Sequence, residues 1–427
     1  MTTRGWWLVL LNFLLPGSAQ LLAGSRRLGR FGVVSTFILW FVAAVGAVVY
    51  FLNRSVVTML ATNVFALLAA EIVLAAYAVL WLVLTLDTLR LVRLVKTGPV
   101  ARPFIAVLAL IGLVASAGVA AFGANIADIT RSTISAVFDS GDYEEPVDGR
   151  YNILLLGGDA GPDRTGLRPD SISIASVDAE TGATTIIGLP RNFERAVFVG
   201  DSPLYQVFPN GYDCGDDCLL GYLYTEGQNH PDLYPDAEAN GSQPGIEAMR
   251  DAAEGITGLT LQYYVLIDMQ GFSDLIDALG GVSIEVPERT PIGPVTSPTP
   301  YGYVEAGAQH LDGPTALWYA RSRFESNDYE RMARQRQVQA AILEQFEPAN
   351  VLTRFQAVAD AGAQVVKTDI PQVMLGLFTD LAGKSRALPL TTLEVVPPEF
   401  NNLDPDYDFI RARVQELLVV PTAPPAE

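Results

Sequence analysis

Five arginines lie within sixteen residues of one another late in the chain: Arg321, Arg323, Arg331, Arg334 and Arg336. Their surroundings are acidic, since residues 128–427 contain 45 Asp and Glu but only 19 Lys and Arg. A guanidinium group is permanently charged and presents a planar fork of donors, which matches a phosphate or a carboxylate. The cluster therefore indicates a site for an anionic ligand. An internal ion-pair network with the abundant carboxylates is the alternative.

A helix predicted over Asp328–Phe346, with Asn327 or Asp328 as its N-cap, would orient part of this cluster. Its apolar stripe, formed by Val338 and Ile342, must face the core. Residues three and four apart share one face of a helix. Three polar side chains continue the stripe toward the N-terminus: Arg331, Arg334 and Gln335. We therefore expect them to point inward, where guanidinium groups need an anion.

The remaining arginines of the cluster have different expected positions. Arg336 falls on another face of the predicted helix, so we expect it to be solvated. If Tyr319–Arg323 is extended, Arg321 and Arg323 point the same way and add two donors to the site.

Two aspartates lie at the ends of predicted strands, Asp159 after one strand and Asp170 before the next. The apolar run Asn152–Leu156 ends in Gly-Gly and then Asp159, and Asp170 lies eleven residues later at the start of the next strand. Ligands of α/β proteins bind beyond the carboxyl ends of strands, and two carboxylates there are suited to a hard cation such as Mg²⁺. The alternative is that both aspartates cap turns.

A further arginine, Arg191, follows the strand that ends at Leu189-Pro190. A strand terminus can project it into the same crevice as the two aspartates. A surface salt bridge is the alternative.

Other chemistries have little support. His230 and His310 lie in loop-like stretches, and no Gly-x-Ser-x-Gly motif is present. Cys214 and Cys218 are the only cysteines, and their spacing favours a local disulfide over free thiols or a metal site. A disulfide implies an oxidising, extracytoplasmic location. The acidic net charge of −19 argues against a nucleic-acid partner.

The residues after 150 alternate between short β-rich runs and helical patterns, which predicts an α/β fold with a mostly parallel or mixed sheet. The predicted strands are Tyr151–Leu156, Ser171–Val177, Thr184–Leu189, Tyr263–Asp268 and Val282–Val286. Besides Asp328–Phe346, the predicted helices are Gly245–Gly255, Phe272–Leu279, Val351–Ala361 and Gln372–Leu381.

The first 127 residues are of another kind, with nine basic side chains and only Glu71 and Asp87 as acids. Three apolar runs, 31–52, 64–86 and 104–124, are each long enough to cross a bilayer. Arginines 26, 27 and 30 precede the first run, and a second basic group lies between the second and third. The positive-inside rule then places the N-terminus in the cytoplasm and the domain after residue 125 outside, in a multi-pass cell-membrane protein.

The rest of this region is assigned by composition. Trp6–Leu22 is broken by Pro16-Gly17 and is predicted to be interfacial or re-entrant, with a fourth span as the alternative. Glu71 lies inside a span, where it is a functional candidate or simply faces a neighbouring helix. The predicted membrane region is thus 1–125, followed by a linker at 126–150, a domain at 151–418 and a disordered tail at 419–427.

Four motifs in order resemble the LytR-CpsA-Psr family of cell-wall ligases. They are NILLLGGDAG with the later RPDS, then LPRN, then YYVLIDMQGFSDLIDALGGVSIEVP, and AGAQHLDGPTALWYARSRFESNDYERMARQRQ. The resemblance runs from about Tyr151 to Phe346. It implies an α/β/α sandwich with a central mixed sheet. The family's activity is the transfer of a glycan phosphate from a polyprenyl-pyrophosphate carrier to peptidoglycan.

The resemblance also implies roles for individual residues. Asp159 and Asp170 would hold Mg²⁺ or Mn²⁺ on the pyrophosphate. The expected pyrophosphate ligands are Arg168, Arg191, Arg321, Arg323, Arg331, Arg334 and Gln335. Asp328 would orient them, and Arg164 is a weaker counterpart of Arg168. Asp159, Asp170, Arg191, Arg321, Arg323 and Arg331 would form the catalytic set.

The sequence departs from the family where Asn192 replaces a common aspartate and where a following lysine is missing, near Pro209-Asn210. The three apolar runs also exceed the single helix usual in the family. Two other functions therefore stay open. One is a polyprenyl-pyrophosphate hydrolase, and the other is a non-catalytic lipid-binding regulator of the cell envelope. The apolar lipid tail needs a tunnel, for which the helices around Phe272–Leu279 and Val338–Phe346 are candidates.

Overall fold

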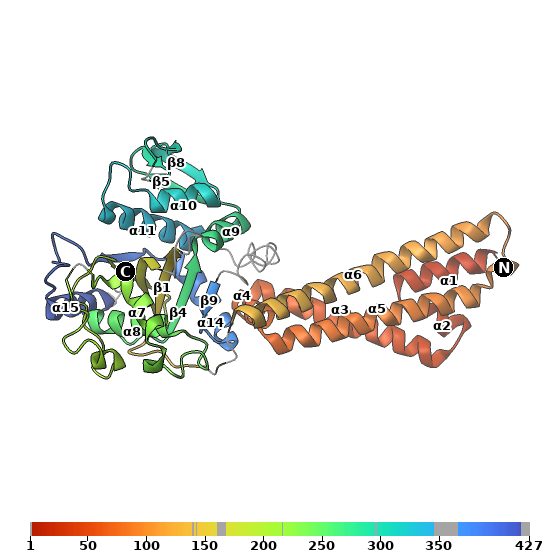
Figure 1. The fold of residues 1–427 in the computed structure, drawn as a ribbon. Helices are drawn as coiled ribbons and strands as arrows, with labels where there is room; N and C mark the ends of the chain where they lie inside the picture. Colours follow the sequence, from red (N-terminus) through yellow and green to blue (C-terminus); the bar gives the residue numbers. More distant parts are fainter. Residues whose placement is uncertain are drawn as a thin grey trace, which may run out of the picture. The chain divides into compact units, whose positions relative to one another are not determined.

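The computed structural model describes residues 2–138, 141, 143–159, 168–215, 217–294, 297–345 and 366–419 (Figure 1). By its internal contacts the chain divides into two compact units, Met1–Ser132 and Thr133–Glu427. The predicted helix Val351–Ala361 and the tail from residue 420 lie outside the described residues.

Three helices of the first unit are long and apolar enough to cross a membrane. They are α3 (Arg26–Leu52), α5 (Val64–Val92) and α6 (Ala101–Val137), and the short α4 (Arg54–Thr62) joins the first two. Each long helix contains one of the predicted apolar runs. The helices extend beyond those runs because backbone hydrogen bonding continues after the apolar residues end.

The N-terminal segment forms two short helices, α1 (Thr2–Leu14) and α2 (Ser18–Ala23), with Pro16-Gly17 between them. Their 13 and 6 residues rise 1.5 Å each, so neither helix spans a hydrocarbon core of about 30 Å. Leu8 and Ala19 are buried in one cluster with Val92 and Ile105. The break lies where Pro16-Gly17 was expected to interrupt the segment, and the interfacial or re-entrant position and the fourth span both stay predictions.

Glu71 faces a neighbouring helix. Its carboxylate accepts a hydrogen bond from Nε of Arg131 at 3.2 Å, which joins α5 to the late part of α6. This is the simpler of the two interpretations of that acid, because the pairing explains its presence without a ligand.

The predicted linker begins too early, because α6 continues to Val137. Ala124, Ala127, Thr130 and Ile134 are all buried. Their three-and-four spacing is that of one helical face, so the helix continues through polar residues that composition alone assigned to a tether.

The second unit is built on a six-stranded sheet of order β10-β3-β2-β1-β4-β9. Its strands are β1 (Arg150–Asp159), β2 (Arg168–Asp178), β3 (Thr184–Leu189), β4 (Tyr263–Asp268), β9 (Val366–Thr368) and β10 (Thr391–Glu394). The pairs β1–β4 and β10–β3 are parallel, and the other three pairs are antiparallel. All four predicted strands of this sheet are present. The edge strands β9 and β10 were not predicted, since three or four residues show no clear alternation.

Helices cover both faces of this sheet (Figure 1). One layer consists of α7 (Leu223–Asn229), α8 (Pro244–Thr257) and α15 (Tyr407–Leu418). The other contains α9 (Met269–Leu279), α11 (Asp328–Gln345) and α14 (Leu375–Ser385). Side chains alternate along β1, so that Leu154 and Leu156 pack with α8 while Tyr151 and Ile153 pack with α14. The expected α/β/α sandwich with a mixed central sheet is confirmed.

A small sub-structure packs on the α9–α11 layer, away from the sheet. It contains the ribbons β5 (Val282–Val286) with β8 (Gly307–Leu311) and β6 (Thr290–Ile292) with β7 (Gly302–Val304). It also contains α10 (Gly313–Arg321). The hypothesis of an extended segment at 319–323 is wrong for its first half. Asp312 caps α10 by accepting from the backbone N–H of Thr315, and the helix then runs through Arg321.

Candidate functional site

Three strand ends meet at one edge of the sheet. β1 ends at Asp159, opposite Arg168 at the start of β2. β3 ends at Leu189, which pairs with Ile172 of β2. The end of β1, the start of β2 and the residues that follow β3 are thereby brought to one place.

A β-bulge releases Asp170 from this pairing. Gly157 pairs with Ser171 and Gly158 pairs with Pro169, which leaves Asp170 as an extra residue on β2. A bulge bends its strand and redirects the side chain of the extra residue. Asp170 is therefore turned out of the ladder, toward the arginines.

Asp170 is held by two of the predicted arginines. Its Oδ1 accepts from Nη1 of Arg191 at 2.5 Å, and its Oδ2 lies 4.0 Å from Nη1 of Arg331. Nη2 of Arg331 also donates to the backbone oxygen of Asp170 at 2.9 Å. Arg331 reaches this position from α11 although its side chain is only 3% exposed. This inward position agrees with the helical phase of Arg331.

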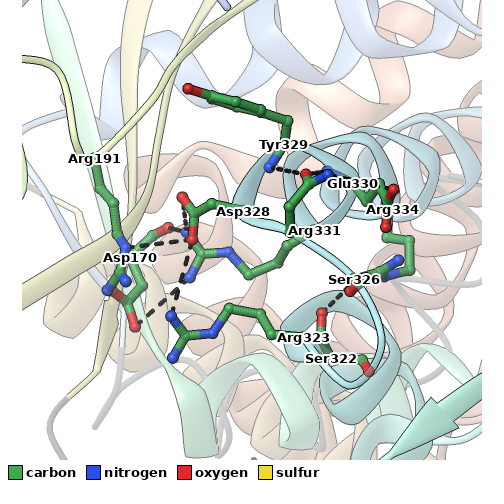
Figure 2. Close-up of polar contacts among 11 residues, drawn as sticks. Asp170, Arg191, Ser322, Arg323, Ser326, Asp328, Tyr329, Glu330, Arg331 and Arg334 are labelled. Carbon is green, nitrogen blue, oxygen red and sulfur yellow. Dashed lines mark hydrogen bonds and ion pairs between the residues drawn. The ribbon is translucent and has the colours of Figure 1, made fainter. Parts of the chain in front are cut away.

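Asp328, the first residue of α11, closes the cluster from the other side. Its Oδ2 lies 3.1 Å from Nη2 of Arg331, and its Oδ1 lies 3.5 Å from Nε of Arg191 and 4.0 Å from Nη1 of Arg323. Asn327 caps the helix, because its Oδ1 accepts from the backbone N–H groups of Tyr329 at 2.9 Å and Glu330 at 3.0 Å. Figure 2 shows three guanidinium groups converging on two carboxylates. Among the side chains described here, the guanidinium groups exceed the carboxylates by one positive charge.

The electrostatics of the cluster shift the pKa values of Asp170, Arg191 and Arg331. Burial by itself would raise the pKa of Asp170, but the charges of Arg191 and Arg331 outweigh it, and its pKa lies below the ordinary value. Burial acts to lower the pKa of Arg191, yet Asp170 and Asp328 raise it overall. For Arg331, burial prevails and the pKa is lowered, although an arginine stays protonated under such a shift. An anionic ligand would supply the charge that the partly desolvated cluster lacks.

Arg334 is buried as predicted, but its guanidinium serves the protein itself. Nε donates to the backbone oxygen of Tyr319 at 3.2 Å, and Nη2 donates to the backbone oxygen of Ser322 and to Oγ of Ser326 at 3.1 Å. Figure 2 shows it directed toward these serines and away from Asp170. It closes the turn between α10 and α11, which positions Arg323.

The expectation that Arg336 is solvated is wrong. The residue is 6% exposed, and its Nε donates to Oε1 of Glu394 on β10 at 2.7 Å. Nη1 donates to the side chain of Gln339, one turn further along α11. The helix lies between the sheet and the outer sub-structure, so a face opposite the apolar stripe is also covered.

An apolar cavity of about 320 Å³ lies between the sheet and helices α9, α10 and α11. Leu155, Val265 and Ile267 line it from the sheet, and Phe272, Val338 and Ile342 line it from the helices. The last three come from the two stretches predicted as candidates for a lipid tunnel. The volume is within the range of small-molecule sites, which are mostly apolar with a few placed polar groups.

The polar residues of this cavity connect it to the charged cluster. Asp170, Arg321 and Gln335 all line it, so Asp170 belongs to both features. Oε1 of Gln335 is buried and has no hydrogen-bond partner among the described residues. A buried amide oxygen without a partner is costly, and a ligand donor in the cavity would satisfy it.

The remaining predicted site residues stand as follows. Arg168 lies at the start of β2 with its guanidinium 5.0 Å from the ring centre of Tyr222. Asp159 is described by its backbone alone, and Arg164 lies outside the described residues. Among the described residues, no group of three His, Cys, Asp or Glu side chains is placed to hold a metal ion. Mg²⁺ commonly binds through one or two carboxylates and substrate phosphates, so the adjacent positions of Asp159 and Asp170 are compatible with it.

Cys214 and Cys218 form a disulfide, with their Cα atoms 5.2 Å apart. The segment that follows lies against the strand-end loop, because the backbone N–H of Gly221 donates to the oxygen of Arg191 at 2.8 Å. The disulfide therefore restricts the chain three residues before Gly221, which supports the backbone of Arg191.

Sequence reasoning missed a buried asparagine that joins two parts of the site. Oδ1 of Asn402 accepts from the hydroxyl of Tyr329 at 3.1 Å, and its Nδ2 donates to the backbone oxygen of Asn192 at 3.2 Å. Its backbone oxygen accepts from the N–H of Glu194 at 2.9 Å. Asn402 thus ties the loop after β3 to the first turn of α11. It lies far from both in sequence and has no local signal.

Comparison with known proteins identifies the family to which the chain belongs. The LytR_cpsA_psr family model matches residues 124–404. The chain is 27% identical over 222 residues to a polyisoprenyl-teichoic acid–peptidoglycan teichoic acid transferase, TagU, of Halalkalibacterium halodurans, covering 52% of the chain and 61% of the relative. It is 27% identical over 278 residues to the cell wall biosynthesis protein LcpA of Corynebacterium glutamicum, covering 58% of the chain and 51% of the relative. The chain thus matches less than two thirds of the length of either relative.

Among solved structures, TagV of Bacillus subtilis is similar with a TM-score of 0.45 and 22% identity. The similarity covers 64% of this chain and 98% of that one.

Proposed function

Because the chain belongs to the LytR_cpsA_psr family, we propose that it transfers a glycopolymer from a polyprenyl-pyrophosphate carrier to peptidoglycan. One observation carries the proposal: an apolar cavity opens at Asp170 into a cluster with one unbalanced positive charge. A polyprenyl chain suits the cavity, and a pyrophosphate suits the guanidinium groups. The TagU and TagV relatives are named for the same class of reaction.

In the proposed reaction, a peptidoglycan hydroxyl oxygen forms a bond to the phosphorus that bears the glycan. The bond from that phosphorus to the bridging oxygen breaks, and polyprenyl phosphate leaves while the hydroxyl proton passes to solvent. Negative charge develops on the bridging oxygen, and Arg191, Arg323 and Arg331 converge where it would be stabilised. The lowered pKa of Asp170 makes it a weak base, so its part is to hold Arg191 and Arg331 in place.

We also propose Mg²⁺ or Mn²⁺ as a cofactor bound by Asp159 and Asp170. The ion would neutralise pyrophosphate charge when bound. This is compatible with the bulge, which leaves Asp170 beside the end of β1. Arg191 already bonds to Oδ1 of Asp170, so Oδ2, which is 4.0 Å from Nη1 of Arg331, and Asp159 would supply the protein ligands.

The test uses the full-length protein in detergent with a polyprenyl-pyrophosphate saccharide and a peptidoglycan acceptor. Transferred glycan phosphate and released inorganic phosphate are measured separately, with and without Mg²⁺. We expect transfer, reduced about 100-fold or more in Arg323→Ala and unchanged in Arg413→Ala, whose guanidinium pairs with Glu399 on the surface. Phosphate release without transfer would instead indicate a hydrolase. Donor binding without any turnover would indicate a lipid-binding regulator.

A further inference from the structure

An exposed aromatic platform lies beside the cavity. It consists of Tyr301 and Tyr303 on the β6–β7 ribbon and Trp318 on α10. Tyr301 is 70% exposed and Tyr303 is 46% exposed, while Trp318 is half-buried. Rings of this size are normally buried or covered, so a group of them in solvent indicates a binding surface.

The backbone presents the two tyrosines on one side. β7 pairs with β6 in antiparallel register, with Tyr303 opposite Pro291, and the N–H of Tyr301 continues the ladder by donating to Ile292 at 2.7 Å. Residues two apart in a strand point to the same face. Ser322 donates to the backbone oxygen of Pro291 at 2.5 Å, which fixes the ribbon to the end of α10. The position of the platform is therefore fixed by these hydrogen bonds.

The platform is continuous with the cavity. The rings of Tyr301 and Trp318 meet edge to face, with centres 6.0 Å apart. The guanidinium of Arg321 lies 5.4 Å from the ring centre of Trp318, and Arg321 also lines the cavity. A ligand that extends from the cavity to the platform would contact Arg321 first, and then Trp318 and Tyr301.

Polar groups accompany the outer ring. The guanidinium of Arg289 lies 3.6 Å from the ring centre of Tyr303, and its Nε donates to Glu305 at 3.0 Å. Both charged side chains are more than half exposed. Arg289 thus stacks on one face of Tyr303, and charged donors and acceptors accompany the aromatic rings.

We propose that this platform binds the pyranose rings of the donor saccharide next to the pyrophosphate, an inference that rests on the proposed function. One face of a pyranose is made of C–H groups with partial positive charge, which stack on the electron-rich face of an aromatic ring. Its hydroxyl groups can form hydrogen bonds with Arg289, which is stacked on Tyr303, and with Glu305, which pairs with Arg289. The first sugar is bonded directly to the pyrophosphate, so it must lie next to whatever the pyrophosphate contacts at the mouth. This continuity selects the donor over a separate acceptor glycan.

The experiment compares two ligands on the full-length protein in detergent: polyprenyl pyrophosphate with a disaccharide and polyprenyl pyrophosphate without sugar. Tyr301→Ala is expected to weaken binding of the saccharide-bearing lipid about tenfold and to leave the sugar-free lipid unchanged. Tyr301→Phe keeps the ring and should retain wild-type affinity. Phe409→Ala is the matched control, since Phe409 is 45% exposed on α15 and does not line the cavity.

Fluorescence gives a second readout. Trp318 is the only tryptophan after Trp81. The saccharide-bearing lipid should change the emission of the wild-type protein, and Trp318→Phe should abolish that change.

Four results would overturn the proposal. The first is equal loss of affinity for both lipids in Tyr301→Ala, and the second is no loss for either. The third is an effect only on the KM for peptidoglycan fragments, which would make the platform an acceptor site. The fourth is an effect only on partition into sugar-free vesicles, which would make it a membrane contact.

Arg323→Ala separates the platform proposal from the proposed function, because it should weaken binding of both lipids equally if the pyrophosphate site is right. If neither lipid binds the wild-type protein, the proposed function fails and this inference fails with it.

Discussion

Arg331 and Arg334 lie three residues apart on α11 and are both buried, yet they contact different groups. Arg331 contacts Asp170 and Asp328 and faces the strand ends, whereas Arg334 donates to backbone oxygens of the α10–α11 turn. Helical phase correctly predicts that both point inward. It does not distinguish a guanidinium that meets carboxylates at a site from one that satisfies carbonyls, because the distinction depends on the partner.

We therefore expect opposite effects from substituting the two arginines. Arg331→Lys should reduce glycan transfer by about 100-fold. Nη2 of Arg331 donates to Asp328 and to the backbone of Asp170 while Nη1 faces the Asp170 carboxylate, and a single ammonium has no second nitrogen for that position. Arg334→Ala should mainly lower stability, by about 2–4 kcal/mol, because it leaves buried carbonyls of Tyr319 and Ser322 without donors.

Turnover at low temperature and thermal melting of the same preparations would check this contrast. An Arg334→Ala protein that melts like the wild type while losing turnover would assign Arg334 to the ligand instead.

At the scale of single elements, α8 carries an acid without a cationic partner among the described ion pairs. Oδ2 of Asp251 accepts from the hydroxyls of Ser202 at 2.5 Å and Tyr234 at 2.6 Å. Burial raises the pKa of Asp251 above its ordinary value of 3.8, even though these two hydrogen bonds act to lower it. The hydrogen bond from Ser202 to Asp251 thus fixes the loop to α8, and desolvation of the carboxylate opposes it.

This shift has a definite sign. A carboxyl group with a raised pKa binds more protons in the folded state, so it favours folding at low pH, and this contribution is lost as the pH rises above about 4. Asp251→Asn keeps an acceptor for both hydroxyls and removes the charge. The melting temperature of the variant relative to the wild type should therefore be higher at pH 7.5 than at pH 4.5. A difference that does not change with pH would mean that the pKa of Asp251 is not raised.

The loop closed by the disulfide is a second element with a measurable role. Joining two cysteines four residues apart restricts the unfolded chain by about 2 kcal/mol. We expect the double variant Cys214→Ser with Cys218→Ser to melt several degrees lower. We also expect its KM to rise more than its kcat falls, because Gly221 still donates to the backbone of Arg191 but from a less restricted loop. An unchanged KM would show that the loop does not position Arg191.

At the scale of the whole molecule, the distribution of charge divides the chain into a basic, apolar part and an acidic part. The first unit has basic loops between apolar helices, and the second is an acidic α/β/α domain around one basic cluster. A lipid-linked donor is confined to a bilayer, so an enzyme that uses it benefits from a membrane anchor. In the proposed topology, the second unit and its disulfide lie on the outer side.

Cysteine labelling tests this topology, since the native cysteines are paired and give no background. Asn53→Cys, between α3 and α4, should react with a membrane-impermeant thiol reagent in intact cells. Val95→Cys, which replaces a side chain that is 83% exposed in the basic segment after α5, should react only after permeabilisation. The reverse pattern would place the domain in the cytoplasm.

The sequence by itself determined the features that depend on local periodicity and composition. The three apolar runs and strands such as Thr184–Leu189 and Tyr263–Asp268 follow from continuous apolar or β-rich composition. The inward face of α11 follows from a repeat of 3.6 residues. The arginine cluster and the acidic residues at the strand ends were also visible, because residue type alone carries that signal.

Tertiary structure decided what each of these residues contacts. The bulge that frees Asp170 arises from the register of two strands, and the burial of Arg336 depends on Glu394, which lies 58 residues away. The same holds for Asn402, whose partners come from two distant segments, and for the cavity at the charged cluster. A charged side chain can be buried only beside a compensating group, and the fold, not the neighbouring sequence, brings that group into contact.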